Sequence, residues 1–194
     1  MKLFMVRHGQ TTANVANLLY GQMEFPLTEM GQKQAEAIRP ILAKHKFDRV
    51  YSSDLGRAIE TQRIALPGVE GIRTPLLREI NIGKLTGLTY TEAEETYPEE
   101  IKAARVAGYD WFGGESHDDL LARMRAFLDM LEADPCENVI AFSHRGMLGF
   151  MLQVVLGCKF SRSLTLSSNC AIQVFEFDGS RWKLLAWNYM MDID

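Results

Sequence analysis

Apolar and polar positions alternate along this chain in blocks that predict strands and helices in turn. The first block, residues 2–6, is a short apolar run that stops before Gly9, as a buried strand does. Apolar residues at helical spacing follow Thr28 as far as residue 45, and Thr28 is a suitable N-cap. Pro40 lies inside this stretch, so we expect a kink or a helix boundary there.

The next blocks repeat the order of strand, polar loop and helix. Residues 49–51 have the composition of a short strand, and a polar turn follows them directly. A helix is expected over residues 55–66, with Ser53 or Asp54 as its cap and Arg57 in its first turn.

An acidic helical segment occupies the middle of the chain. It follows a brief strand near Ile72 and covers residues 89–109, with an interruption at Pro98. Within this segment, Thr91 and Glu94 have the spacing of a capping box.

Strand and helix alternate again in the second half. Ser116 predicts the start of an amphipathic helix whose apolar face runs from Leu120 to Leu131. Residues 138–142 form an apolar run typical of a buried strand, and an apolar helix is expected over 147–156.

Two strands, 172–177 and 182–187, close the chain on either side of Asp178-Gly179, a pair typical of hairpin turns. The alternation before them is typical of an α/β protein with mostly parallel strands. The sequence therefore predicts one domain over residues 1–194. We expect a three-layer α/β/α sandwich with a mostly parallel central sheet and an antiparallel C-terminal strand.

Composition and charge limit the classes of partner that this protein is expected to bind. The chain is 47% hydrophobic and 24% charged, like an ordinary globular protein, and its formal net charge is -4. That charge argues against nucleic acid or an anionic membrane as a partner, so any anion site must gather its arginines locally. The three cysteines are widely spaced, and we find no signal peptide and no membrane-spanning run. We expect a cytoplasmic monomer or homodimer with reduced cysteines.

Three of the predicted strands end in cationic or reactive residues: Arg7-His8, Ser53 to Arg57, and Ser143-His144. Because ligands gather at the carboxyl ends of parallel strands, we expect these groups to converge. Each guanidinium group can bind two phosphate oxygens at once, and a neutral imidazole is a nucleophile toward phosphorus. A carboxylic acid such as Glu79 can protonate the leaving oxygen and later activate water.

Each of these residues has an ordinary explanation as well. A histidine at a strand end is often a hydrogen-bonded structural residue, and an arginine on a helix is often a solvated cation. Two histidines and a glutamate could also suggest a metal site. The chain lacks the close spacing of His-Glu-x-x-His, so we expect no metal.

Taken in order, the polar motifs resemble those of the histidine phosphatase superfamily, which includes the cofactor-dependent phosphoglycerate mutases. The resemblance spans nearly the whole chain, and the motifs occur in the family's order. They are Arg7-His8-Gly9-Gln10-Thr11 with Asn14, Leu27-Thr28-x-x-Gly31-x-x-Gln34-Ala35, Ser52-Ser53-Asp54-Leu55-x-Arg57-Ala58-x-x-Thr61, Leu77-x-Glu79 with Gly83 and Gly87, and Gly114-Glu115-Ser116 followed by Ser143-His144.

The resemblance implies a role for each matched residue. His8 would be the nucleophile that takes the phosphoryl group as phosphohistidine. Glu79 would be the general acid and then the general base. No metal and no organic cofactor is implied. The remaining matched residues would line the phosphate pocket and stabilise the charge of the transition state: Arg7, Arg57, His144 and, as a further phosphate contact, Asn14.

The chain departs from the family at two places. Arg145 follows the second histidine where the family commonly has a glycine. Its side chain is either an extra phosphate-facing cation or, as we favour, points outward and pairs with an acid such as Glu115. Ile80, Asn81 and Ile82 stand where the mutases have an arginine and a tyrosine that hold the substrate, which favours hydrolysis over mutase activity.

We therefore expect a metal-independent phosphomonoesterase that hydrolyses a small phosphorylated metabolite through phosphohistidine. A phosphoglycerate mutase and a catalytically silent phosphate-binding module are the alternatives. Residues 87–115 lie between two loops of the predicted site, so we expect this segment to cap it. Its aromatic residues either pack on the sheet or face the pocket: Tyr90, Tyr97, Tyr109, Trp111 and Phe112.

Overall fold

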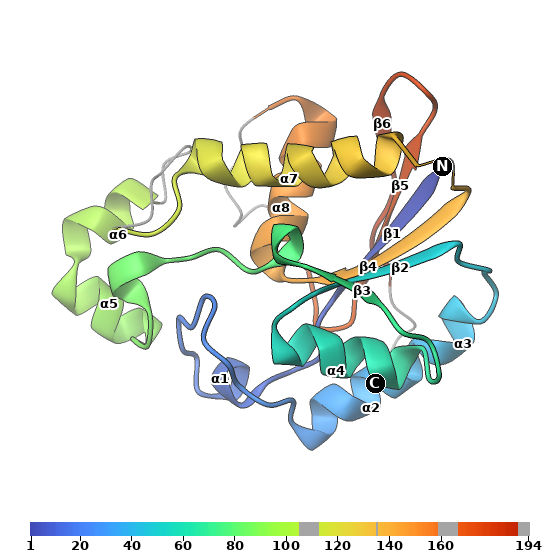
Figure 1. Cartoon of the computed structure of the whole chain (residues 1–194). Coiled ribbons are helices and arrows are strands. Elements are labelled where there is room, and N and C mark those ends of the chain that lie inside the picture. Colours follow the sequence, from blue (N-terminus) through green and yellow to red (C-terminus); the bar gives the residue numbers. More distant parts are fainter. Residues whose placement is uncertain (105–112, 135, 159–166, 190–194) are drawn as a thin grey trace.

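A six-stranded sheet with helices on both faces forms the centre of the computed structural model, which describes residues 1–104, 113–134, 136–158 and 167–189 (Figure 1). The strands are β1 (Lys2–Arg7), β2 (Arg49–Ser53), β3 (Ile72–Thr74), β4 (Asn138–Ser143), β5 (Ile172–Phe177) and β6 (Trp182–Tyr189). Their order across the sheet is β3-β2-β4-β1-β5-β6. The first four are parallel, and the hairpin of β5 and β6 joins β1 antiparallel. The predicted fold class is confirmed.

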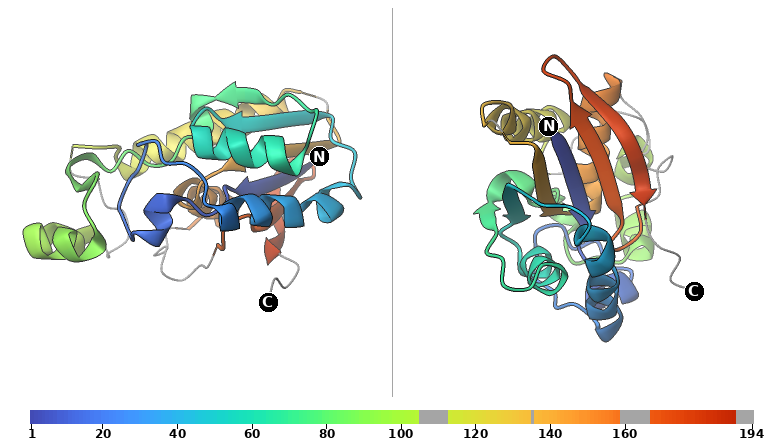
Figure 2. Two further views of the ribbon diagram at one scale, coloured as in Figure 1. Left: turned by 90° about the horizontal axis from the view of Figure 1, so that it is seen from below. Right: turned by 90° about the vertical axis from the view of Figure 1, so that its right-hand side faces the viewer.

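The helices lie in two layers, one on each face of the sheet (Figure 2). The helices and short 3-10 turns of the described residues are α1 (Thr12–Val15), α2 (Glu29–Ala37), α3 (Arg39–Leu42), α4 (Gly56–Ala65), η1 (Pro75–Leu77), η2 (Gly83–Leu85), α5 (Tyr90–Thr96), α6 (Pro98–Ala104), α7 (His117–Glu132) and α8 (Arg145–Leu156). Leu3 and Met5 of β1 pack with α7 and α8, whereas Phe4 and Val6 pack with α2, α3 and α4. Because β1 is covered on both faces, its sequence is a continuous apolar run rather than an alternating one.

The predicted boundary at Pro40 is confirmed. The helical stretch divides at Ile38, where α2 ends, and Pro40 lies in the first turn of α3. A proline there costs no hydrogen bond, because the first amide groups of a helix have no partner within it. The predicted cap of α4 is wrong. Leu55 is the N-cap residue without a side-chain bond, and the Ser53 hydroxyl instead contacts His144, 2.9 Å away.

Helix α5 begins where the predicted helical segment 89–109 begins, but its capping box differs from the expected one by two residues. The capping box is formed by Thr89 and Glu92, whose backbone and side-chain groups bond each other, rather than by Thr91 and Glu94. Both pairs have the same spacing, so local sequence does not separate them. A backbone bond of 2.7 Å from Leu19 to Leu88 holds the chain extended just before Thr89, and the helix begins after it.

Helices α5 and α6 project from one side of the sheet (Figure 1). Pro98 begins α6, so the predicted interruption is confirmed. Tyr97 packs against the core, whereas Tyr90 is 58% exposed. The other cap aromatics, Tyr109, Trp111 and Phe112, lie outside the described residues, and the role of 87–115 as a cap stays a prediction.

The cysteines are free thiols, and Cys170 is buried under the end of β1. Burial raises the pKa of the Cys170 thiol to about 12, so the thiol keeps its proton at neutral pH. Across the part of the chain that the structure describes, no helix combines the length and the apolar character needed to cross a membrane.

Candidate active site

The carboxyl ends of β1, β4 and β2 lie side by side and bring the predicted site residues together. The register pairs Arg7 with Ser143 and Ser52 with Phe142, so His8 and His144 leave the sheet at the same level. The centroids of the two imidazole rings are 5.2 Å apart. The predicted convergence therefore follows from parallel strands that end in register.

His8 is buried and is held in one tautomer. Its Nδ1 lies 2.7 Å from the carbonyl oxygen of Gly9, so Nδ1 carries the proton and Nε2 keeps its lone pair. Burial, followed by the charges of Arg57 and Arg7, holds the pKa of His8 well below its ordinary value. The ring is therefore neutral at pH 7, and Nε2 is available as a nucleophile.

Tyr20, which the sequence analysis did not single out, lies directly beside this nitrogen. Its hydroxyl is 3.4 Å from Nε2 of His8 and accepts a hydrogen bond from Nδ2 of Asn14 at 3.0 Å. Its ring lies 4.7 Å from the guanidinium carbon of Arg57, which is the geometry of a cation–π contact. A loop tyrosine belongs to no periodic pattern, so the sequence carries no signal for this position.

His144 is fully buried and connects two other residues of the site. Its Nδ1 accepts a hydrogen bond of 3.2 Å from Nε of Arg57, so the proton resides on Nε2, which donates to the Ser53 hydroxyl at 2.9 Å. Burial and the nearby Arg57 hold the pKa of His144 well below its ordinary value. His144 is therefore a neutral ring that fixes the plane of the Arg57 guanidinium.

Arg57 is a buried cation without a carboxylate partner among the described residues. Its terminal nitrogens donate to the carbonyl oxygens of Gly21 and Met23 at 2.7 and 2.8 Å. With the bond to His144, three of the five N–H groups of a guanidinium are used, and two are left for a ligand. Burial lowers the pKa of Arg57, as expected for a charge taken out of water.

Arg7 is a second cation without a carboxylate partner among the described residues, and it is half-buried. One terminal nitrogen donates to the carbonyl oxygen of Ser167, and its buried Nε has no partner among the described residues. Burial lowers the pKa of Arg7. Gln173 of β5 pairs with Met5 in the antiparallel register, so it is a diagonal neighbour of Arg7 on the same face of the sheet. The buried Oε1 of Gln173 also has no hydrogen-bond partner among the described residues. Arg7 thus has spare donors at the edge of the site.

Glu79 lies in the loop after η1, and its side chain reaches the first turn of α8. Its carboxylate accepts hydrogen bonds from the backbone N–H groups of Ile80, at 2.9 Å, and Gly146, at 3.3 Å. A Cβ atom on Gly146 would lie 2.3 Å from Oε1 of Glu79, so only glycine leaves room for the carboxylate. The charge of Glu79 raises the pKa values of Arg7 and Arg57, against the larger effect of burial, which lowers them.

The loop that carries His8 is held by a close backbone contact with α2. A Cβ atom on Gly31 would lie 2.1 Å from the carbonyl oxygen of Gln10, and one on Gly9 would lie 2.5 Å from that of Gly31. The Gly9 amide also donates to the Thr61 hydroxyl at 3.0 Å. These contacts give a physical reason for the two glycines in the first two motifs.

The predicted pairing of Arg145 with Glu115 is wrong. Glu115 receives two hydrogen bonds from Arg123, at 2.8 and 3.0 Å, and a third from the backbone amide of Asn81. Helix α7 places Arg123 next to Glu115, and Arg123 therefore takes the position that the prediction gave to Arg145. Arg145 is exposed and has no hydrogen-bond or ion-pair partner in the described residues.

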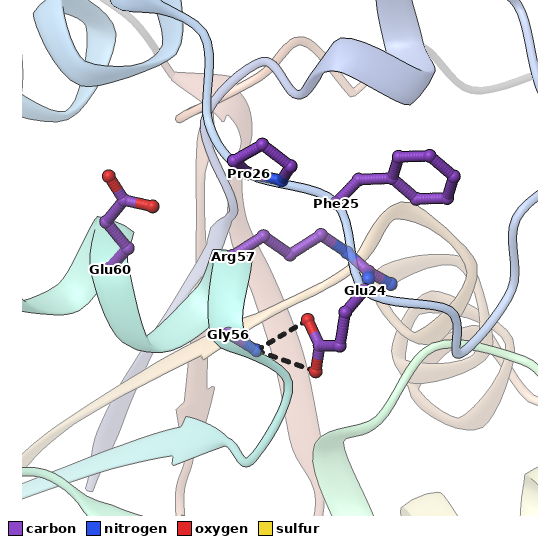
Figure 3. Close-up of a pocket in the computed structure, with 6 residues that line it drawn as sticks. All are labelled: Glu24, Phe25, Pro26, Gly56, Arg57 and Glu60. Carbon is purple, nitrogen blue, oxygen red and sulfur yellow. Dashed lines mark hydrogen bonds between the residues drawn. The ribbon is translucent and has the colours of Figure 1, made fainter.

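A hollow of about 240 Å³ lies beside the cluster, lined by Glu24, Phe25, Pro26, Gly56, Arg57 and Glu60. Figure 3 shows the Arg57 side chain running between α4 and the loop with Phe25 and Pro26. The Glu24 carboxylate accepts from the Gly56 amide at 3.0 Å, at the positive end of α4. The hollow thus adjoins the guanidinium of Arg57.

The arrangement is suited to binding an anion and attacking it. Two guanidinium groups without a carboxylate partner in the described residues flank a neutral imidazole whose unprotonated Nε2 lies 3.4 Å from the Tyr20 hydroxyl, and the charge of Glu79 acts on both cations. Charge-assisted bonds from arginine to phosphate are among the strongest in proteins. No group of three or more potential metal ligands occurs in the described residues.

Comparison with known sequences gives consistent matches over nearly the whole chain. A family model described as histidine phosphatase superfamily (branch 1) matches residues 3–190. A Yersinia pestis protein named probable phosphoglycerate mutase GpmB is 32% identical over 199 residues, covering 96% of this chain and 90% of its own.

Solved structures of similar proteins also align over nearly the whole chain. The α-ribazole phosphatase of Shigella flexneri aligns with a TM-score of 0.87 and 25% identity, over 97% of this chain and 96% of its own. A mycobacterial glucosyl-3-phosphoglycerate phosphatase, solved in complex with VO3, aligns with a TM-score of 0.87 and 28% identity, over 97% of this chain and 99% of its own.

Proposed function

Because the chain belongs to the histidine phosphatase superfamily, branch 1, we propose that it hydrolyses a phosphomonoester of a small metabolite through a phosphohistidine at His8. The observation that supports this most directly is the unprotonated Nε2 of a neutral His8 beside the guanidinium groups of the buried Arg57 and the half-buried Arg7. The phosphatase names of two similar structures support the same reaction class. A cytoplasmic location and a monomeric or homodimeric state stay predictions.

In the first step Nε2 of His8 attacks phosphorus in line with the ester bond. The N–P bond forms and the P–O bond breaks, while Glu79 gives its proton to the leaving oxygen. Arg7 and the spare N–H groups of Arg57 bind the phosphoryl oxygens, whose negative charge they stabilise. His144 acts in this step by orienting Arg57, and Asn14 by orienting Tyr20 beside the reacting nitrogen.

In the second step water replaces the alcohol. Glu79, now a carboxylate, takes a proton from a water molecule that attacks phosphorus, and the N–P bond breaks. Inorganic phosphate leaves, and His8 and Glu79 return to their starting states. Every proton is exchanged between Glu79, the leaving group and water, so the cycle needs no metal and no organic cofactor.

A phosphoglycerate mutase is the second candidate, because relatives carry that name. The positions where the mutases would hold their substrate argue against it. Ile80 and Ile82 are 1% and 6% exposed, and both belong to the core. The Asn81 side chain accepts from the Gly83 amide at 3.1 Å. Mutase assays with and without bisphosphoglycerate separate the two activities.

Phosphate release from a panel of phosphomonoesters tests the proposal. We expect turnover that survives chelators, is inhibited by vanadate and is lost in His8→Ala. The matched control is His45→Ala, because His45 is exposed and packs on Phe4 and Phe47, away from the strand ends. The trapped phosphoenzyme is expected to be acid-labile and base-stable.

Three results would overturn the proposal. An acid-stable phosphoenzyme would point to another nucleophile. Loss of activity in chelator, restored by a divalent ion, would rule out the metal-free mechanism. Absence of phosphate release from every ester, together with phosphate binding that depends on Arg7 and Arg57, would instead identify the third alternative, a silent phosphate-binding module.

A further inference from the structure

A buried glutamine lies among apolar residues on one face of the sheet. Gln173 of β5 pairs with Met5 in the antiparallel register and is fully buried. The next pair on this face, Leu3 and Phe175, belongs to the core. A glutamine in such surroundings costs free energy unless its amide group is hydrogen-bonded, so its contacts indicate why it is there.

The side-chain amide of Gln173 is connected to Arg7 through one residue, Ser167. Nε2 of Gln173 donates to the Ser167 hydroxyl at 3.3 Å, and the backbone carbonyl of Ser167 accepts from Nη1 of Arg7. Ser167 is itself buried. Arg7 and Gln173 are diagonal neighbours on the same face of the sheet. The two side chains therefore reach the same residue from adjacent strands.

The contact with Ser167 decides which edge of the Arg7 guanidinium is left for a ligand. Nη1 is the terminal nitrogen on the Cδ side of this planar group, so the other edge carries the N–H groups of Nε and Nη2. The buried Nε has no partner among the described residues, and Nη2 makes no hydrogen bond to them. Two parallel N–H groups of this kind match two oxygens of a phosphoryl group.

The amide of Gln173 is only partly satisfied. Its buried Oε1 has no hydrogen-bond partner among the described residues. A buried acceptor without a partner lowers the free energy of unfolding, and an apolar side chain of the same shape would avoid that cost. Stability therefore does not explain a glutamine at this position, whereas its contact with Ser167 does.

We propose that Gln173 is a positioning residue for the reaction: by fixing Ser167, it holds Arg7 with the Nε and Nη2 edge toward the phosphoryl group. This inference rests on the proposed phosphatase function and adds a residue that the matched motifs do not contain. In this role Gln173 does not touch the substrate and acts through Ser167 and Arg7. Its loss should weaken phosphate binding while every reacting group stays in place.

Two variants remove the bond between Gln173 and Ser167 from its opposite ends. Gln173→Met replaces the amide with an apolar side chain of similar length, and Ser167→Ala removes the hydroxyl but keeps the carbonyl that binds Arg7. We expect each variant to bind inorganic phosphate about 2- to 10-fold more weakly than the wild-type protein, the range for one hydrogen bond. The double variant should bind no more weakly than the single ones, because all of them break the same bond. Isothermal titration calorimetry at constant ionic strength measures the Kd.

Melting temperatures separate positioning from a general loss of stability. Ser167→Ala leaves the buried amide N–H of Gln173 without its partner and should melt below the wild-type protein. Gln173→Met removes the unpaired acceptor together with this donor and should not. The matched control is Gln153→Met. Gln153 is a buried glutamine of α8 whose Oε1 lies 3.0 Å from His117, and its loss should leave phosphate binding unchanged.

A change at Arg7 tests whether Gln173 acts through this residue. Arg7→Lys keeps the positive charge but has no planar fork for Ser167 to orient. Gln173→Met should therefore weaken phosphate binding less in Arg7→Lys than in the wild-type protein. An equal loss in both backgrounds, an unchanged Kd in Gln173→Met, or phosphate affinities that follow the melting temperatures would overturn the proposal. Because binding is measured at equilibrium, absence of hydrolysis would contradict the proposed function and leave this test intact.

Discussion

At the scale of single residues, burial decides the chemistry of the two histidines. His8 and His144 are 1% and 0% exposed, and each has Arg57 close by. Both effects disfavour the charged imidazolium, so the pKa of each ring lies well below its ordinary value. The same shift that keeps both rings neutral at pH 7 makes the folded state sensitive to acid.

The free energy of unfolding should therefore fall as the pH drops below about 6.5, because unfolded histidine gains a proton there while the buried rings do not. The two rings together account for roughly 2 kcal/mol between pH 6.5 and 5.5. Urea unfolding across this range measures the effect. His8→Asn should reduce the slope and His45→Asn should not; a stability that is constant over this range would contradict the buried neutral histidines.

At the scale of elements, loop contacts decide where helices begin. The start of α5 is set by the backbone bond between Leu19 and Leu88, which places Thr89 at the N-cap. The same loop continues to Tyr20, beside Nε2 of His8. The first turn of α5 is therefore linked to the active site through one short segment of backbone.

Thr89→Ala should destabilise α5 by about 1 kcal/mol, because the capping hydroxyl that accepts from the Glu92 amide is lost. Hydrogen exchange of the Ala93 and Tyr97 amides is expected to become about fivefold faster if α5 opens locally. Thr91→Ala is the matched control, since Thr91 is exposed and is not the cap residue. A larger effect from Thr91→Ala than from Thr89→Ala would show that Thr91 and Glu94 form the capping box, as the sequence suggests.

At the scale of the whole molecule, a chain with a net charge of -4 concentrates positive charge at one edge of its sheet. Arg7 and Arg57 are taken out of water there without a carboxylate partner in the described residues, which costs free energy. We therefore expect a phosphate dianion that binds these residues to offset that cost in the folded state alone.

Inorganic phosphate or vanadate should raise the melting temperature. At a concentration one hundred times the Kd, the gain is about 2.7 kcal/mol, or roughly 5 to 10 °C for a domain of this size. Thermal scans at constant ionic strength, with chloride as the control anion, measure it. Arg7→Gln should abolish the shift, and an equal response to chloride would show that screening, rather than a built phosphate site, is responsible.

Local sequence determined the elements and the motif residues of this protein. The strand before Arg7, the Thr28 cap and the boundary at Pro40 depend on neighbours within a few positions, so the pattern predicts them. The sequence likewise predicted that His8 and His144 lie together, because parallel strand ends converge whatever the loops between them do.

Tertiary structure alone decided which polar atoms meet. Tyr20 reaches His8, and Arg123 takes Glu115 from Arg145, through loops whose paths no periodic pattern records. Gln173 comes next to Arg7 only through the register of β1 and β5. The physical reason is that a hydrogen bond depends on distances of a few tenths of an ångström between residues far apart in sequence, and only the packed chain sets these distances.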